Sequence, residues 1–326
     1  MIDKGSFVIS LDFELTWGAI DLWTPEGYGQ SHILQVREVV QRLIMLFEKY
    51  EVRATFATVG LLILRDVNDI KRHMPSKPPT YSNEALRPYG AYLNYVENQN
   101  PHLFFAPELV ELLKRSPNIE IGTHTFGHYY CWEPGQTLEQ FDADMAMMEK
   151  VAKEKGLKIE SIVFPKNQVS ENFLAVCAKY GITTYRGNAK KYFNETQNRW
   201  MDFYYQVSRL LDAYVNWGGN TSHSYASLQK SNLPMNVPAS RMLRPYMRRL
   251  RWFEGMRLHR IKKEMKYAAK HHELYHLWWH PHNFGADMDK NFAFLEAVLR
   301  YYKECHADYG MESMTMNDFY SKFNNK

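Results

Sequence analysis

The chain has 326 residues, a formal net charge of +4, and 45% hydrophobic and 23% charged residues. This composition excludes wholesale disorder and suffices for one large domain with a sizeable core. A net charge so close to zero argues against a dedicated nucleic-acid-binding protein, which ordinarily carries a concentrated basic surface.

Three cysteines, none in a CxxC pair, make a poor disulfide framework and indicate a reducing compartment. No apolar run approaches the roughly 20 residues that a membrane-spanning helix needs. The first residues, with no basic leader and no long apolar segment after it, predict no signal peptide. We therefore expect a cytoplasmic protein, with a peripheral position at the inner membrane face as a variant of that expectation.

Short apolar strand candidates alternate along the chain with longer segments of helical periodicity. The strands are expected at 7–11, 52–58, 119–121, 161–164, 182–185 and 273–279, and the helices at 33–50, 107–115, 137–155, 171–180 and 291–306. Repeated strand–helix units predict an α/β fold with a parallel sheet, open or closed into a barrel. Two stretches, at about 66–104 and 186–272, interrupt the alternation and are expected to be insertions in a single domain spanning 1–326.

Histidines and acids gather where the predicted strands end. His124 and His128, in the sequence His-Thr-Phe-Gly-His, would converge on one metal if they occupied a single helical turn. Asp12 and Glu14 follow the first strand, and period-two alternation would point both acids the same way while Phe13 enters the core. Taken alone, each pair also fits an ordinary structural role, namely chance spacing for the histidines and loop capping for the acids.

A late strand carries further histidines. His276 and His280 fall on one side of the strand, and Pro281 ends it. We expect His276 to be a core histidine, whereas His280, at the carboxyl end, is the better candidate for a general acid. Lys166 and Asn167, after Pro165, could line the same rim with donors.

These pieces, in this order, resemble the NodB-type polysaccharide deacetylases (carbohydrate esterase family 4), of which the chain would be a divergent member. The family's acidic pair corresponds to Asp12 and Glu14, its H-[S/T]-x-x-H motif to His124–His128, its third motif to Phe164-Pro165, and its last motif to His280. The resemblance implies an incomplete or distorted (β/α) barrel of about seven strands. It covers most of the chain, from about residue 7 to residue 319.

The resemblance also implies a reaction, in which a metal-dependent hydrolase removes an N-acetyl group from an amino sugar. Glu14, His124 and His128 would be the ligands of a divalent metal, most simply Zn²⁺, with Co²⁺, Ni²⁺, Mn²⁺ or Fe²⁺ as alternatives. Asp12 would be the base and His280 the general acid, although the roles of Asp12 and Glu14 could be exchanged. The family's usual arginine is missing near Pro165, where Lys166 and Asn167 stand instead.

The substrate is less closely defined. Trp17, Pro165, Lys166, Asn167, Trp279 and His282 are the candidates for binding it. We expect a cytoplasmic precursor of surface polysaccharide, with a phosphate, nucleotide or lipid attached to the amino sugar. A sugar N-deformylase or a cyclic-amide hydrolase would use the same metal chemistry, and a non-catalytic sugar-binding module is the alternative from another class.

The positive charge is concentrated in one segment. Residues 241–270 hold eleven Lys or Arg and two acids, a net +9, so that the remainder of the chain carries −5. Interleaved with aromatic and aliphatic residues, this segment suits an anionic membrane surface or a phosphate-bearing substrate. A solvated helix over the barrel, or a subunit contact, would explain it equally well. No nucleic-acid partner is expected.

Overall fold

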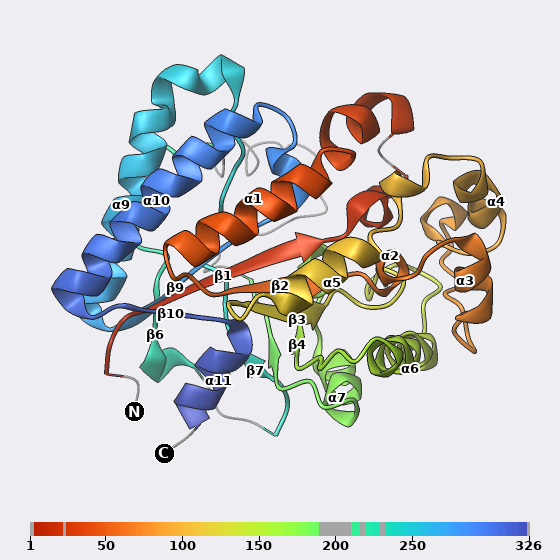
Figure 1. Cartoon of the computed structure of the whole chain (residues 1–326). Helices are drawn as coiled ribbons and strands as arrows, with labels where there is room; N and C mark the ends of the chain where they lie inside the picture. The colour runs from red at the N-terminus through yellow and green to blue at the C-terminus, as the bar shows by residue number, and fades with distance from the viewer. Residues whose placement is uncertain are drawn as a thin grey trace.

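The computed structural model of the chain describes residues 3–21, 24–188, 210, 212–215, 219–228 and 232–324. Its strands are β1 (Ser6–Phe13), β2 (Ala54–Thr58), β3 (Ile119–Thr123), β4 (Ser161–Ile162), β5 (Thr184–Tyr185), β6 (His223–Ser224), β7 (Met235–Asn236), β8 (Arg241–Met242), β9 (Glu273–Trp279) and β10 (Glu312–Met314). They form one curled sheet in the order β6-β9-β1-β2-β3-β4-β5-β7, with β10 paired to β1 and β8 to β9 (Figure 1). Of these pairs only β6–β9 is antiparallel.

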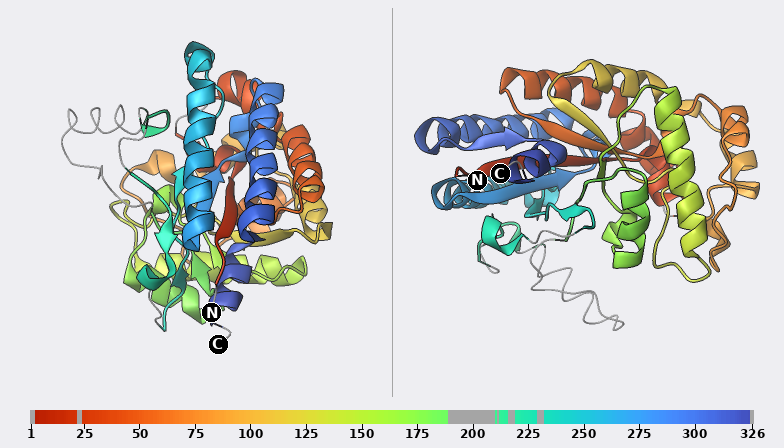
Figure 2. Two further views of the ribbon diagram at one scale, coloured as in Figure 1. Left: turned by 90° about the vertical axis from the view of Figure 1, so that its left-hand side faces the viewer. Right: turned by 90° about the horizontal axis from the view of Figure 1, so that it is seen from below.

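Helices cover the outside of the curled sheet (Figures 1 and 2). They are α1 (Val36–Lys49), α2 (Gly60–Ile63), α3 (Val67–Arg72), α4 (Ala91–Glu97), α5 (Pro107–Arg115), α6 (Leu138–Glu154), α7 (Glu171–Lys179), α9 (Glu254–His271), α10 (Met288–Tyr309) and α11 (Met316–Asn324). The predicted α/β fold, a distorted (β/α) barrel of the NodB type, is thus confirmed.

The described residues form ten strands where about seven were predicted. All six expected strands are present, and the additional strands β6, β7, β8 and β10 are two or three residues long. Strands this short leave no period-two pattern to read in a sequence. Three of them, together with α9, lie in the stretch 186–272, so that stretch contributes to the barrel itself. The earlier irregular stretch, 66–104, contains α3 and α4.

The segment 235–243 joins the two ends of the main sheet. The Met235 and Val237 amides donate to backbone oxygens of the β5 segment at 2.7 and 2.9 Å. Immediately afterwards the Ser240 and Leu243 amides donate to backbone oxygens of β9, both at 2.8 Å. This segment therefore bridges the β5 and β9 sides and brings the carboxyl ends of both strands to one mouth.

Alternation along β1 separates the core from the site. Phe7, Ile9, Leu11 and Phe13 are buried in the large core beneath the outer helices. The even-numbered Ser10 and Asp12 face the interior of the curled sheet, where they meet groups from β5 and β9. The strand that fixes the core thus also places polar side chains at the mouth.

Within the part of the chain that the structure describes, no helix is both long enough and apolar enough to cross a membrane.

Candidate metal and catalytic site

Glu14, His124 and His128 converge at the carboxyl ends of β1 and β3. Glu14 Oε2 lies 3.3 Å from His124 Nε2 and 3.2 Å from His128 Nε2. One ligand atom from each of the three residues falls within 4.8 Å of the other two, and all three side chains are buried. The structure therefore brings together the three residues predicted to be metal ligands.

The two histidines meet through a loop, so the expected helical turn is wrong. Thr125 and His128 have φ angles of 64° and 55°, in the left-handed region that interrupts a helix. Asp144 of α6 anchors the loop by accepting the backbone amides of Phe126 and Gly127 at 2.7 and 2.8 Å. Sequence reasoning missed Asp144, whose place within a regular amphipathic helix gives no sign of this contact.

Hydrogen bonding shows which nitrogen of His124 faces Glu14. His124 Nδ1 lies 2.7 Å from the Val163 backbone oxygen, and because a carbonyl only accepts, Nδ1 carries the proton. In the neutral ring, Nε2 then presents a lone pair to Glu14 Oε2, which is also an acceptor. Two acceptors 3.3 Å apart repel each other unless a proton or a cation lies between them.

The donor set fits a divalent metal. One carboxylate and two imidazoles leave open positions for water and substrate, as catalytic zinc requires. The bond from His124 Nδ1 to a backbone carbonyl is the orienting contact that metal-bound histidines ordinarily make. Glu14, His124 and His128 are thus the residues that would hold such an ion.

Asp12, two residues before Glu14, has a different partner. Arg186 follows β5 and donates to both carboxylate oxygens of Asp12, from Nη1 at 2.5 Å and from Nη2 at 2.7 Å. Both side chains are buried. Arg186 thus supplies Asp12 with a guanidinium partner, which reaches the acid from the end of β5 and not from the segment at Pro165.

A chain of hydrogen bonds holds Arg186 in place. His276 Nδ1 donates to the Val237 oxygen at 3.1 Å, so its Nε2 accepts from the Ser10 hydroxyl at 2.9 Å. The Ser10 oxygen in turn accepts from Arg186 Nη1 at 3.1 Å. The Arg186 guanidinium also lies 4.2 Å from the ring centre of Trp278. His276 is therefore a core histidine, as predicted, and it positions Arg186 through Ser10.

His280 faces both acids from the end of β9. Its Nε2 lies 3.4 Å from Glu14 Oε1 and 3.7 Å from Asp12 Oδ2. The His280 side chain keeps 21% of its surface exposed, whereas both acids keep 5%. The partly exposed imidazole can therefore meet a substrate that enters from the mouth.

The charges around the acids set their protonation. Burial alone would raise the pKa of Asp12, but the adjacent Arg186 guanidinium holds that pKa below the usual 3.8. Burial likewise opposes ionisation of Glu14, but the charge of the neighbouring His280 is the main cause that holds its pKa well below 4.5. Burial lowers the pKa of His128, against the attraction of Glu14. Both acids are thus ionised and His128 is neutral near pH 7, the forms that a base and metal ligands need.

Two of the residues expected to bind substrate lie in the core. Trp17 donates from its indole nitrogen to the Phe104 oxygen at 2.7 Å, and Trp279 stacks on Phe284. Both are buried because their side chains point away from the mouth, which corrects their assignment as substrate-binding residues. The neighbouring Trp278, partly exposed, is the β9 tryptophan next to Arg186 and His280.

The remaining candidates lie around the acids and histidines at the mouth. The buried His282 ring stacks at 4.9 Å on His280, and burial lowers its pKa to about 3. Pro165 is buried, and Asn167 accepts a hydrogen bond from Arg186 Nη2 at 3.2 Å. Lys166 is exposed, with Nζ 4.3 Å from the ring centre of Tyr130, whose ring in turn contacts His128.

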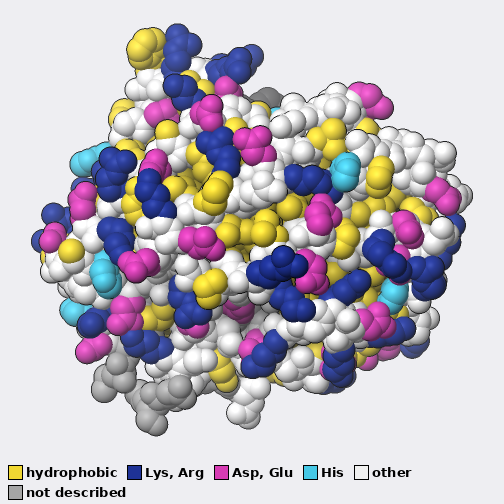
Figure 3. Space-filling model, viewed as in Figure 1, with side chains coloured by type: hydrophobic (Ala, Val, Ile, Leu, Met, Phe, Trp, Pro, Cys, Tyr) yellow, Lys and Arg dark blue, Asp and Glu magenta, His cyan; other side chains and the backbone are white. Residues whose placement is uncertain are grey.

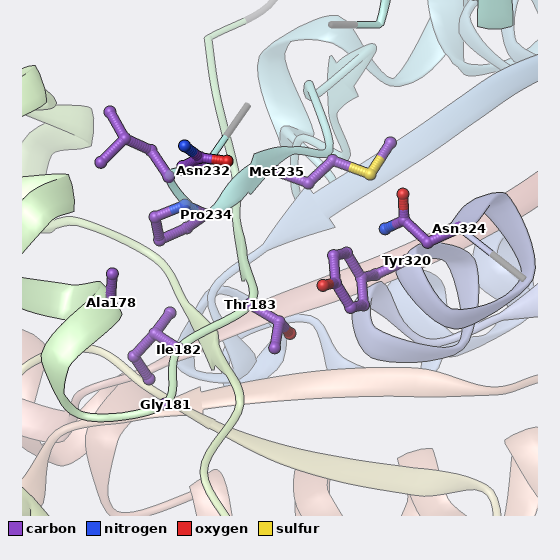
Figure 4. Close-up of a pocket in the computed structure, with 10 residues that line it drawn as sticks. Ala178, Gly181, Ile182, Thr183, Asn232, Pro234, Met235, Tyr320 and Asn324 are labelled. Atoms are coloured by element: carbon purple, nitrogen blue, oxygen red, sulfur yellow. The ribbon is translucent and has the colours of Figure 1, made fainter. Parts of the chain in front are cut away.

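A separate cavity of about 360 Å³ lies away from these groups, between the start of β5, β7 and α11 (Figure 4). It is lined by Thr183, Met235 and Tyr320 among others. Its walls are neutral side chains, and none of the acids, histidines or arginines at the mouth lines it.

Comparison with known proteins agrees with the fold. Residues 26–185 match the family model described as polysaccharide deacetylase. No curated protein sequence matches the chain.

Two solved structures assigned as polysaccharide deacetylases resemble the whole chain. One, from Mycobacterium smegmatis, is 11% identical with a TM-score of 0.57, over 98% of this chain and 91% of its own. The other, from Pseudomonas aeruginosa PAO1, is 11% identical with a TM-score of 0.54, over 98% and 90%. A 4-alpha-glucanotransferase from Thermococcus litoralis, 10% identical with a TM-score of 0.53, matches 98% of this chain but 41% of its own.

The curled sheet, with acids and histidines at its mouth, is an α/β barrel that shares its fold with these two polysaccharide deacetylases. The family match, over just under half of the chain, together with this fold confirms the relationship to the NodB-type polysaccharide deacetylases.

Proposed function

We propose that this protein is a metal-dependent hydrolase that removes an N-acetyl group from an amino sugar. The observation that carries the proposal is that the two acids have different partners. Glu14 faces two histidines, and Asp12 is paired with Arg186. A set of metal ligands alone would indicate only that a metal is bound. An ionised acid and a partly exposed histidine next to these ligands supply the proton transfers that hydrolysis needs.

Glu14, His124 and His128 would hold the ion, most simply Zn²⁺. When bound, a divalent metal lowers the pKa of water and polarises the amide carbonyl. The hydrogen bond from His124 to the Val163 oxygen orients His124 for this role. Asp144 holds the loop 124–128, the histidine loop, by accepting a backbone amide of that loop. These supports keep the ligands in place before any ion or substrate arrives.

Asp12 is the base and His280 the acid in this mechanism. Asp12 accepts a proton from the attacking water through Oδ2, the oxygen nearer to His280. His280 Nε2 then donates a proton to the nitrogen of the departing amine, which is a poor leaving group without one. Arg186 keeps Asp12 ionised and fixes the direction of its carboxylate.

The substrate is proposed to carry an anionic group. Lys166 is exposed beside the histidine loop and has no acidic partner within 4 Å among the described residues. A free ammonium at the rim would suit a phosphate-, nucleotide- or lipid-phosphate-linked amino sugar. The three buried free cysteines are compatible with a cytoplasmic location, where such precursors are made.

The test is release of acetate from a panel of acetamido sugars, with and without a linked phosphate or nucleotide. The protein is first stripped with a chelator, and Zn²⁺, Co²⁺ or Mn²⁺ is then restored. We expect release that depends on the metal and is faster for the anionic substrates. Release of formate from the matching formamido sugars would favour the deformylase alternative. Tight sugar binding with no release from any candidate would favour the non-catalytic module.

A further inference from the structure

The basic segment contains two different kinds of arginine. Arg241, Arg257 and Arg260 are buried and neutralised by acids: Arg241 and Arg260 pair with Glu264, and Arg257 pairs with Glu254. The pair between Arg241 of β8 and Glu264 ties α9 to the barrel, and the other two pairs lie within α9, so only part of the +9 charge is available to a partner.

The available part is concentrated at one end of α9. Residues 247–256, which we call the arginine tip, span the short helix η7 (Arg248–Phe253) and the first residues of α9. Arg249 and Arg251 are exposed there, and neither has an acidic partner within 4 Å among the described residues. Arg248 is paired with Asp287 at 2.9 Å, which ties the tip to the start of α10.

The same tip exposes large apolar side chains. Trp252 is 79% exposed, Phe253 46%, Met256 44% and Met247 36%. Figure 3 shows a projection at the top of the molecule, over the upper end of α9 in Figure 1, where hydrophobic and basic side chains lie together. Four exposed apolar side chains within ten residues would not be expected of a surface that meets only water.

We propose that the arginine tip docks on an anionic lipid surface. Aromatic and methionine side chains can enter the boundary between headgroups and acyl chains, while Arg249 and Arg251 neutralise lipid phosphates. Charge complementarity favours this occupant over a second copy of the chain, because two such tips brought together would oppose like charges. Docking would be peripheral and reversible, since the inserted area is small.

The topology gives the docked protein an orientation. β8 runs parallel to β9, so the chain leaves β8 at the carboxyl end of β9, where His280 lies. The tip follows within five residues, and α9 then runs back toward the start of β9. The tip and the catalytic groups therefore share one end of the barrel, and docking would bring the mouth near the bilayer. The further consequence, a lipid-linked amino sugar as substrate, rests on the proposed function.

Vesicle sedimentation tests the docking without reference to activity. Vesicles of phosphatidylcholine with phosphatidylglycerol should retain the protein, and vesicles of phosphatidylcholine alone should not. Arg249→Ala/Arg251→Ala should weaken binding about 25-fold, since each basic residue at an anionic surface contributes about 1 kcal/mol. Trp252→Ala/Phe253→Ala/Met256→Ala should weaken it at least about tenfold.

The matched control removes the same charge elsewhere on the helix. Lys263 and Lys266 are exposed and lie about 14 to 18 Å along the axis from the start of α9, beyond the Debye length of about 8–10 Å. Lys263→Ala/Lys266→Ala should therefore bind nearly as well as the unaltered chain. Equal losses in the control and the tip variants, or no vesicle binding at all, would overturn the proposal. So would concentration-dependent dimers, seen by light scattering, that only the tip variants abolish.

The two proposals fail separately. A protein that releases acetate but ignores vesicles would retain the proposed function and lose the docking surface. A protein that binds vesicles through the tip but hydrolyses nothing would do the reverse.

Discussion

Asp12 lies in β1 and Glu14 directly after it, two residues apart, and each keeps 5% of its side-chain surface exposed. Their surroundings differ completely. On one side of the mouth, Glu14 faces two histidine nitrogens, and on the other Asp12 is held by the two arms of Arg186. Residue type, spacing and burial cannot distinguish the two acids. The groups that other strands bring to each of them decide which is suited to hold a metal and which to take a proton.

The largest expected effect comes from removing the two histidine side chains that face Glu14. His124→Ala/His128→Ala should abolish stoichiometric zinc binding and reduce acetate release to background, because Glu14 alone cannot hold the ion. Metal content by plasma mass spectrometry and acetate release measure the two effects. His259→Ala, which removes an exposed histidine on α9, should change neither. Full activity and retained metal in the double variant would contradict the metal role.

On the arginine side, Asp12→Asn should reduce kcat about 10²–10⁴-fold, the usual range for loss of a general base. The amide keeps the size of the side chain but accepts no proton at neutral pH. Measurement of kcat and bound metal in the same sample separates the two roles of the acids. A variant that stays active but loses its metal would show that the roles are reversed.

Removing Arg186 should lower the free energy of unfolding as well as the rate of the reaction. Arg186→Met leaves the Asp12 carboxylate buried without its partner, a loss expected to cost about 3–5 kcal/mol. Chemical denaturation gives the free energy of unfolding. Asp12→Asn/Arg186→Met should recover part of this loss, because the unpaired charge is gone. Equal stability of the single and double variants would show that the pair is not coupled.

Weakening the contact between Asp144 and the histidine loop should have a smaller effect on stability. Asp144→Asn keeps one acceptor for the Phe126 and Gly127 amides but turns a donor toward the other, at a cost of about 1–3 kcal/mol. Zinc affinity should fall with it, because the loop carries both histidines. Thermal unfolding and a zinc titration measure the two quantities. Glu149→Gln, on the exposed side of the same helix, is the control and should leave both unchanged.

The last effect is absent at neutral pH and develops only as the pH falls. Burial lowers the pKa of His276 to about 3, from 6.5 when the chain is unfolded. As pH falls from 6.5 toward 3 the unfolded chain takes up a proton that the folded chain refuses, so the free energy of unfolding decreases. The contribution is fully present above pH 6.5, and its loss amounts to at most about 1.4 kcal/mol per pH unit. Between pH 6.5 and 3 the denaturant midpoint should fall less steeply with decreasing pH in His276→Gln than in the unaltered chain. Identical slopes would show that His276 does not have the lowered pKa.

The sequence predicted the groups that stand in recognisable patterns. The apolar runs predicted six strands. The convergence of His124 and His128 and the place of His280 could be predicted because these histidines follow such runs. The left-handed backbone at Thr125 and His128 was not, since no local pattern distinguishes a loop from a helical turn at that spacing.

Arg186 was missed although a signal existed. It directly follows the predicted strand 182–185, the same position relative to a strand that singled out Asp12 and His280. It also opens the stretch that was expected to be an insertion, and its partner lies 174 residues earlier in the chain. Contacts of that separation depend on the order of strands in the sheet, which the sequence alone did not supply.

The basic segment shows the same limit. Its +9 charge was visible, but the pairing of Arg241 and Arg260 with Glu264 depends on tertiary contacts. Only the structure separates these internal arginines from the exposed ones at the arginine tip.

The division of roles between the two acids is tested most directly by the zinc content of two matched variants. Glu14→Gln and Asp12→Asn each neutralise one acid without changing its size, and both proteins are reconstituted with Zn²⁺ and dialysed before analysis. We predict that Glu14→Gln loses bound zinc, while Asp12→Asn retains close to one ion per chain. Retention by Glu14→Gln together with loss in Asp12→Asn would contradict the account.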